Sequence, residues 1–174
     1  MTVSVQHRQE NLEFAVRKMM ERVGEQWFGG VLFDILDPEL KDILPTTWAS
    51  LERRWLVSKA QSTLDGHVYY QLTGGGWVDG LRLTGILQST DLRERIIYLR
   101  AKLKDQVKGR SGDADVSIPE FCSANGISRD WLWNVVESKL LENFFPNDIV
   151  DIGWWGHNAR LHVLRVPVDF GMTR

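Results

Sequence analysis

The chain has 174 residues, and its 21 lysines and arginines against 23 aspartates and glutamates give a formal net charge of −2. Hydrophobic residues make up 43% of it, which excludes a disordered or collagen-like chain and is typical of globular proteins. No run of about 18 apolar residues occurs and the first residues lack the apolar core of a signal peptide, so we expect neither a membrane span nor secretion. The single cysteine, Cys122, cannot form an intrachain disulfide, which indicates a reducing, cytoplasmic compartment.

In the first half of the chain, apolar spacing predicts two helices. The first covers residues 8–23, and the second is capped by Thr46 or Thr47. The side chains expected on the buried faces are Leu12, Ala15, Val16, Met19, Val23, Leu51, Trp55 and either Leu56 or Val57.

A strand over residues 68–72 follows these helices, since its residues are β-branched, aromatic and apolar. Two alternatives remain for the next segment. Either Thr73 caps a helix over residues 77–87, or residues 77–83 return as a second strand. The three glycines at positions 74–76 are expected to form a hairpin turn.

The second half begins with a basic helix. Apolar residues spaced by three or four predict a helix over residues 92–107, capped by Thr90 or Asp91. Residues 91–110 hold seven basic and three acidic side chains, whereas residues 111–151 hold two basic and eight acidic ones. We interpret the basic run as a solvated helix face in preference to a phosphate contact, because such faces are common. The small and polar residues 109–115 predict an exposed linker.

Two helices joined by a tight turn come next. A very short strand around residues 116–118 precedes a helix that begins at Pro119 and ends at Gly126. Ser128 caps a further helix that runs to Asn143. Because proline is favoured in the first turn of a helix and glycine just after its end, both boundaries have a physical cause.

A β-hairpin closes the sequence. Alternating residues 150–154 and the apolar run 159–168 predict two strands, joined by a turn at residues 156–158. The inward positions change face along the second strand, which predicts a bulge near Val163.

The order helix, strand, helix, helix and hairpin resembles the winged helix-turn-helix superfamily. The apolar, small and glycine positions that this motif requires are occupied by Phe121, Cys122, Gly126, Ile127, Leu132 and Val135. The resemblance covers residues 91–168, and a generic helical hairpin followed by a β-hairpin is the alternative. It implies a helix placed to contact DNA and a hairpin wing beside it.

The first half repeats these helix starts, core positions and turns at an offset of 81 residues. Pro38 then matches Pro119, Leu51 matches Leu132, and the glycines at 74–76 lie opposite residues 155–157. Helix starts, core positions and turns coincide without gaps, although residue identity is no higher than chance.

These patterns together predict an α+β, mainly helical fold. It consists of tandem winged-helix modules with short β-hairpin wings, covering residues 1–88 and 89–174.

No pattern of residues indicates catalysis. The glycines at 74–76 are not followed by the Lys-Ser/Thr of a phosphate-binding loop, and His157 and His162 alone seldom form a metal site. Cys122 occupies the small, buried position of the helix-turn-helix, so packing explains it better than nucleophilic chemistry. We therefore predict a protein that is not an enzyme and has no cofactor or metal.

Duplex DNA is the predicted partner. The residue types that contact bases and phosphates are placed on the second helix of each module and on the second wing. These candidates are Arg53, Arg54, Lys59, Arg129, Asn134, Lys139, His157, Asn158 and Arg160. A helical projection places Asn134 outward together with Asp130, Trp133 and Glu137, and the two carboxylates there would repel DNA.

The eight tryptophans support an alternative function, since this residue is enriched where proteins bind partners. Trp27, Trp48, Trp55, Trp131 and Trp154 are interpreted as core, whereas Trp77, Trp133 and Trp155 are expected to be exposed. Trp133 and Trp155 are the candidate protein-interface residues.

We predict a DNA-associated regulator or accessory factor on this basis. The alternative is a docking or adaptor subunit that binds a protein partner or a second copy of itself, without direct DNA contact. No membrane association is expected.

Overall fold

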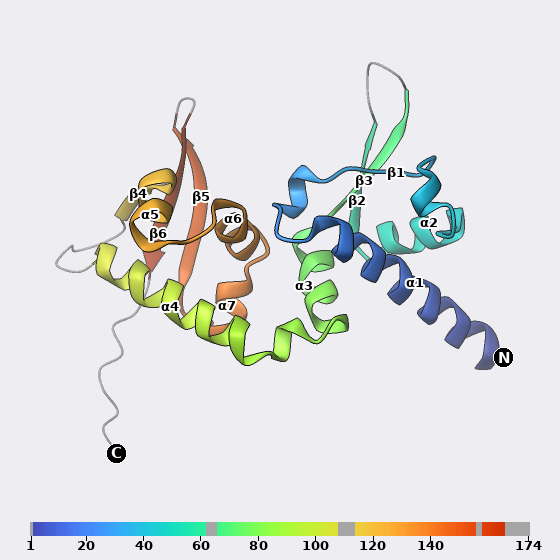
Figure 1. Ribbon diagram of the computed structural model, residues 1–174, viewed down its shortest axis with the longest axis horizontal. Helices are drawn as coiled ribbons and strands as arrows, with labels where there is room; N and C mark the ends of the chain where they lie inside the picture. The colour runs from blue at the N-terminus through green and yellow to red at the C-terminus, as the bar shows by residue number, and fades with distance from the viewer. Residues whose placement is uncertain (1, 62–65, 108–113, 156–157, 166–174) are drawn as a thin grey trace. The chain divides into compact units, whose positions relative to one another are not determined.

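The computed structural model describes residues 2–61, 66–107, 114–155 and 158–165. The chain separates into two compact units, Met1–Gln88 and Ser89–Arg174 (Figure 1). The described residues form seven α-helices and two small antiparallel sheets of three strands each. The predicted α+β, mainly helical class is therefore confirmed.

The first unit contains three helices and one sheet. Its elements are α1 (Thr2–Val23), β1 (Phe33–Asp34), α2 (Pro45–Arg53), β2 (Val57–Gln61), β3 (Val68–Leu72) and α3 (Gly74–Leu83), with single 3-10 turns at Phe28–Gly30, Pro38–Leu40 and Ile86–Gln88. β3 lies between β1 and β2 and is antiparallel to both. The predicted strand over residues 68–72 is thus confirmed.

α1 is amphipathic, and it packs against α2 and α3. α1 begins at Thr2, earlier than the predicted residue 8. The side chains of residues 5–10 are exposed, so apolar periodicity does not reveal this part of the helix. The buried side holds Leu12, Ala15, Val16, Met19, Met20 and Val23.

The predicted capping of α2 is wrong. Leu44 occupies the N-cap and Pro45 the first helical position, where the missing N–H of proline leaves no hydrogen bond unmade. Thr46 and Thr47 lie inside the first turn instead.

The match between Pro38 and Pro119 does not extend to helix length. Residues 38–40 form a single 3-10 turn, whereas the second unit has a full helix at the matching position. The Asp37 carboxylate caps this turn, accepting the N–H of Glu39 at 2.9 Å and a hydrogen bond from Arg22 at 2.5 Å. These two hydrogen bonds hold the pKa of Asp37 below its usual value.

The segment after β3 is a helix. Thr73 is its N-cap, and the Thr73 Oγ1 accepts a hydrogen bond from the N–H of Gly76 at 3.0 Å. The glycines at 74–76 form the first turn of α3, so the predicted hairpin turn there, with its match to residues 155–157, is wrong. This turn lies against the backbone of Leu56, where a Cβ on Gly76 would stand 1.9 Å from the carbonyl oxygen.

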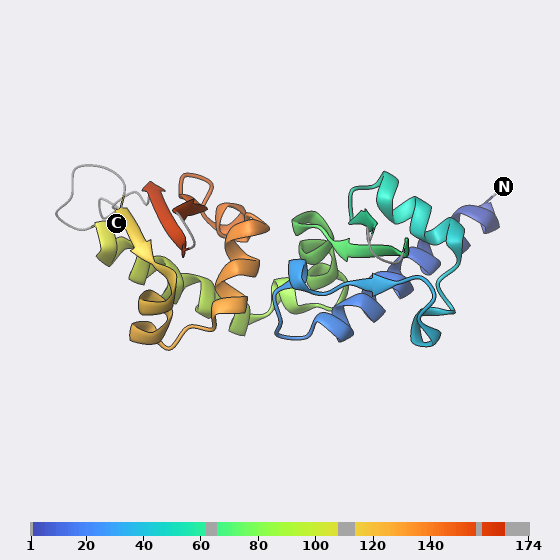
Figure 2. The same cartoon turned by 90° about the horizontal axis from the view of Figure 1, so that it is seen from above.

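The second unit has the same order of strands in its sheet. Its elements are α4 (Thr90–Val107), β4 (Ala114–Ser117), α5 (Ile118–Asn125), α6 (Arg129–Glu137), α7 (Leu140–Phe144), β5 (Ile149–Trp155) and β6 (Asn158–Arg165). β6 lies between β4 and β5, as β3 lies between β1 and β2. Figure 2 shows α4 passing along one side of this unit, and it contacts β4, β6 and α7.

The two helices joined by a tight turn form as predicted. Pro119 is in the first turn of α5, which ends at Gly126 in the left-handed region with φ 64°. Ser128 caps α6 by accepting the N–H of Trp131 at 3.4 Å. Their buried side chains include Phe121, Cys122, Leu132 and Val135.

Other boundaries of the second unit differ from the prediction. α4 is capped by Ser89, whose Oγ accepts the N–H of Leu92 at 3.2 Å, and not by Thr90 or Asp91. Of the predicted linker over residues 109–115, the part up to residue 113 lies outside the described residues. Its last two residues begin β4.

The helix predicted from Ser128 to Asn143 is interrupted. Lys139 adopts the left-handed region with φ 58°, which ends the first segment and starts α7 in a new direction. Apolar spacing continues through the break at Leu140, so periodicity alone does not reveal it.

The bulge predicted near Val163 is confirmed. Val150 pairs with Val163 and Ile149 with Arg165, so Leu164 has no residue opposite it. None of the described helices is long and apolar enough to cross a membrane.

The approach of α3 to Leu56 predicts opposite effects for two neighbouring glycines. We expect Gly76→Ala to lower the free energy of unfolding by about 2–3 kcal/mol, because its methyl group would overlap the Leu56 backbone. Gly75→Ala should be neutral or stabilising by up to about 1 kcal/mol, since its nearest neighbour is Thr73 Oγ1 at 3.7 Å and alanine favours a helix. Urea unfolding of both variants measures the difference, and equal stabilities would contradict the close packing.

Candidate nucleic-acid interface

Two arginines are exposed at the end of α2. Arg53 donates from Nε to the carbonyl of Ala49 at 3.3 Å and from Nη2 to Ser50 Oγ at 3.1 Å, so its guanidinium lies along the helix. Arg54 donates to the side chain of Gln9 at 3.3 Å, which ties it to α1. Among the described residues, no ion pair engages either guanidinium, and both charges face solvent.

Trp55 is the most unusual residue of this surface, and its predicted burial is wrong. Its side chain is 80% exposed, and its backbone has φ 57°, a conformation that residues with a Cβ rarely adopt. α2 ends at Arg53, so Trp55 no longer follows the buried helical face that includes Leu51.

The backbone around Trp55 is held by hydrogen bonds from several elements. The Trp55 N–H donates to the carbonyl of Glu52 at 2.9 Å, and the Trp55 carbonyl accepts the hydroxyl of Thr73. The carbonyl of Leu56 accepts the N–H of Thr73 at 3.1 Å. The indole is therefore displayed from a fixed backbone, although the conformation is strained.

Lys59 is exposed, but it lies on β2 and not on the helix predicted to carry it. It pairs with Tyr70 of β3, and directly paired residues share one face of a sheet. Tyr70 stacks on Trp48 of α2, with 4.8 Å between ring centroids. The face of the sheet that carries Lys59 is therefore the face that packs against α2.

The second unit does not present the predicted contacts in the same way. Asn134, predicted to face outward and contact bases, is buried at 2% exposure, so this prediction is wrong. The buried face of α6 includes Asn134 as well as Leu132, Val135 and Val136, so it is wider than the face that the helical projection assigned to the core. Asp130, Glu137 and Arg129 remain exposed on this helix.

Two of the predicted contact residues of this unit, Lys139 and Arg160, are engaged by protein atoms. Lys139 Nζ lies 3.5 Å from a carboxylate oxygen of Asp151 and 3.6 Å from one of Glu142. Arg160 donates to the backbone carbonyl of Asp115 at 3.3 Å. A phosphate at either cation would have to compete with these acceptors.

The wing candidates are placed only in part. His157 lies outside the described residues, and so do the side chains of Asn158 and Trp155, whose backbones pair at the end of the hairpin. Trp133 is half-buried and makes contacts within the protein, so it is less exposed than predicted.

The other tryptophans divide differently from the prediction. Trp77 is buried and stacks near Phe28, with 5.9 Å between ring centroids, so its predicted exposure is wrong. Trp48 is buried as predicted, whereas Trp27 and Trp131 are half-buried. The guanidinium of Arg95 lies 4.4 Å from the ring centroid of Trp131. The side chain of Trp154 lies outside the described residues.

Within the described ranges, no three His, Cys, Asp or Glu side chains gather in a way that would hold a metal ion. Cys122 is buried, and this burial raises the pKa of its thiol, while the charge of Arg129 opposes the shift. A buried thiol of raised pKa is a poor nucleophile at neutral pH.

Trp55 is the functional candidate that sequence periodicity misses. Its spacing of four from Leu51 predicts the buried face of a helix, and only the length of α2 shows otherwise. The Arg53-Arg54 pair immediately before it is the one available signal, because arginines are mostly exposed and two in succession favour an exposed segment.

Comparison of the chain with protein-family models, with curated proteins and with solved structures found no match.

The strain at Trp55 predicts an order of stability for two variants. Trp55→Gly should be more stable than Trp55→Ala by about 1 kcal/mol, because glycine adopts a positive φ without steric cost and alanine does not. Both variants remove the same exposed indole, so they form a matched pair. Urea unfolding decides between them, and a more stable alanine variant would contradict the left-handed backbone.

Burial predicts that the thiol of Cys122 is protected in the native state. Reaction with a soluble disulfide reagent at mildly alkaline pH should be at least about tenfold slower than in the urea-unfolded chain. Absorbance of the released thiol measures both rates. Equal rates would show that the core around α5 and α6 opens readily.

Proposed function

We propose that the chain is a non-enzymatic, DNA-associated protein built from two winged-helix units, of the kind that acts as a transcriptional regulator or a DNA-associated accessory factor. The proposed partner is duplex DNA, contacted through the first unit.

The winged-helix assignment is supported by the arrangement of elements in both units. Each unit has a first helix, a strand, a second helical segment, a further helix and a β-hairpin. In each sheet, the second strand of the hairpin (β3 or β6) is the central strand. This order supports α2 and α6 as the counterparts of the DNA-contacting helix of a winged helix. A shared fold does not by itself fix a function, so the argument for DNA rests on side chains.

The observation that carries the proposal is the exposed pair of arginines at the end of α2, with a further exposed cation on β2. Arg53 and Arg54 are exposed where α2 ends, and Lys59 is exposed on the face of the sheet that packs against α2. Three such cations match the phosphate contacts by which a winged helix is oriented on a duplex.

The exposed side of α2 favours close approach of DNA. It carries the small side chains of Thr46, Ala49 and Ser50, which leave the helix narrow enough to enter a groove. Trp55 adds an apolar surface at the end of this helix, suited to packing on deoxyribose beside a phosphate contact.

Protein docking remains the second candidate, and the second unit favours it. Asp130 and Glu137 are exposed on α6, and Lys139 is engaged by two carboxylates. This helix would repel a phosphate backbone, but it suits a protein surface of opposite charge.

The DNA proposal predicts that one double substitution reduces the salt dependence of duplex binding. Arg53→Ala with Arg54→Ala should weaken binding to a fluorescent duplex of random sequence. The slope of log affinity against log salt should flatten by about 2, because each lost phosphate contact removes about 0.9. Fluorescence anisotropy over a salt series measures both quantities.

The matched control is Arg17→Ala with Lys41→Ala, which removes the same charge from exposed positions of the first unit outside α2 and β2. This control should retain the slope of the unsubstituted protein. Equal slopes for the two double variants would place the contact elsewhere, and absence of duplex binding at low salt would favour docking.

A further inference from the structure

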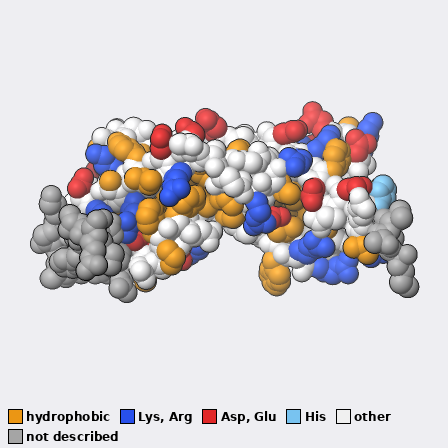
Figure 3. Space-filling model, turned by 90° about the horizontal axis from the view of Figure 1, so that it is seen from below, with side chains coloured by type: hydrophobic (Ala, Val, Ile, Leu, Met, Phe, Trp, Pro, Cys, Tyr) orange, Lys and Arg blue, Asp and Glu red, His pale blue; other side chains and the backbone are white. Residues whose placement is uncertain are grey.

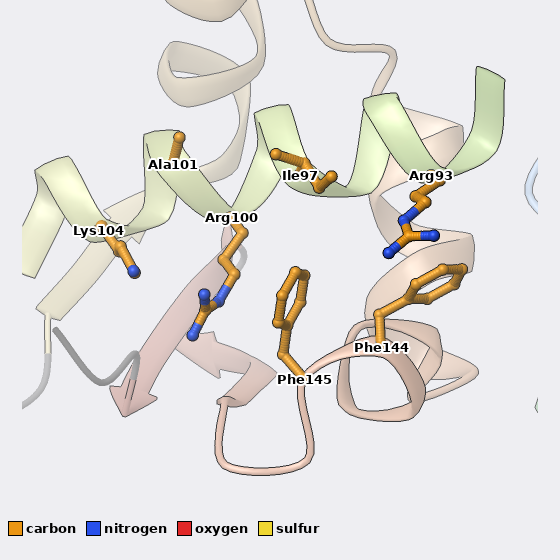
Figure 4. A pocket seen from close by; sticks show the side chains of 7 residues that line it. All are labelled: Arg93, Ile97, Arg100, Ala101, Lys104, Phe144 and Phe145. Atoms are coloured by element: carbon orange, nitrogen blue, oxygen red, sulfur yellow. The ribbon is translucent and has the colours of Figure 1, made fainter. Parts of the chain in front are cut away.

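A pocket of about 390 Å³ lies between α4 and the end of α7 in the second unit. Figure 4 shows Arg93, Arg100 and Lys104 pointing from α4 toward Phe144 and Phe145, which rise from the opposite side. Ile97 and Ala101 complete the lining, all of it within the described part of the chain, and none of these residues is acidic. Its size is that of a site for a small ligand or for one or two side chains.

A buried ion pair holds the walls of the pocket in place. Arg100 donates from Nε to one carboxylate oxygen of Asp148 at 2.7 Å and from Nη2 to the other at 3.0 Å. The Asp148 side chain is fully buried, and the backbone N–H of Asp148 donates to the carbonyl of Phe145 at 2.9 Å. The guanidinium also lies 4.0 Å from the ring centroid of Phe145. The ion pair, the backbone hydrogen bond and the contact with the Phe145 ring therefore hold Arg100, Asp148 and Phe145 in fixed positions, and a ligand would meet a preformed surface.

The pocket carries a net positive charge. Asp148 neutralises Arg100, whereas Arg93 is exposed and enters no ion pair among the described residues. Lys104 contributes a further cation to the rim. The basic run of α4 is therefore not only a solvated helix face, because three of its cations converge on one hollow.

The same pocket is apolar between its cations. Ile97 is 49% exposed, and the rings of Phe144 and Phe145 are half-buried. Figure 3 views the molecule from the side of α4 and shows apolar and basic side chains next to each other there. Exposed apolar side chains within a charged rim are typical of a surface that binds a partner.

We propose that this α4–α7 pocket is the docking site for an acidic segment of a partner protein, whose apolar or aromatic side chain enters the hollow while a carboxylate pairs with Arg93. Charge complementarity selects the acidic segment, and the two phenylalanines with Ile97 select the apolar anchor. A duplex would satisfy the cations only, since its convex phosphate backbone has no group to fill an apolar hollow. The docking site is separate from the proposed DNA contact, which lies on the first unit.

Selection from a displayed library of random peptides tests the proposal with the full chain. Peptides retained by the unsubstituted protein and rejected by the Arg93→Glu variant should combine Asp or Glu with Phe, Trp, Leu or Ile. In fluorescence anisotropy with a labelled selected peptide, Arg93→Glu should weaken binding at least about tenfold. Ile97→Ser should also weaken it, because the anchor loses an apolar contact.

Lys102→Glu is the matched control, since it reverses the same charge on the opposite side of α4 and should leave peptide affinity within about twofold. Circular dichroism of each variant establishes that it is folded. The proposal is overturned if no peptide is enriched, if enriched peptides lack acidic residues, or if Arg93→Glu and Lys102→Glu bind equally. It is also overturned if duplex DNA competes with the peptide and loses its own affinity in Arg93→Glu, because the pocket would then be a phosphate contact.

Discussion

The contact between the first turn of α3 and the backbone of Leu56 determines how the first unit presents its candidate interface. Gly76 has no Cβ, so the turn can lie directly on the Leu56 carbonyl, which also accepts the N–H of Thr73. The Thr73 hydroxyl then reaches the carbonyl of Trp55. These contacts hold the backbone between α2 and β2, where Trp55 adopts its left-handed conformation. The exposed tryptophan at the end of α2 is therefore held in place by packing on the other side of the same segment.

In the second unit, a left-handed residue and a buried ion pair determine the position of α7 and of the loop that follows it. The left-handed residue Lys139 ends α6 and redirects the chain into α7, so that Phe144 and Phe145 approach α4. The buried pair of Arg100 and Asp148 then connects α4 to the loop before β5. Removing one partner of such a pair leaves a buried charge without compensation and commonly costs about 3–5 kcal/mol. The pair thus fixes the loop that follows α7 against α4.

Local rules predicted the boundaries of α5, the start of α6 and one bulge, although the caps that they gave for α2 and α4 are wrong. Pro119, Gly126 and Ser128 mark the boundaries of α5 and α6, and the bulge beside Val163 follows from the change of inward face. Features that depend on distant contacts could not be predicted this way. A helix capped by Thr73 was one of two alternatives, but its start at Gly74 depends on the close approach of Gly76 to the Leu56 backbone, and Asn134 is buried although its polarity favours solvent. Among the site residues, exposure of Arg53 and Arg54 agrees with their charge, whereas exposure of Trp55 depends on where α2 ends.

Trp55 also has a genetic consequence. Its codon, TGG, becomes the glycine codon GGG by one base change, and glycine is the residue that relieves a positive φ. A lineage that no longer uses this surface would gain stability from that single mutation and lose nothing in return. Among related chains, tryptophan at this position would indicate that the surface is under selection for binding, and glycine would indicate that it is not.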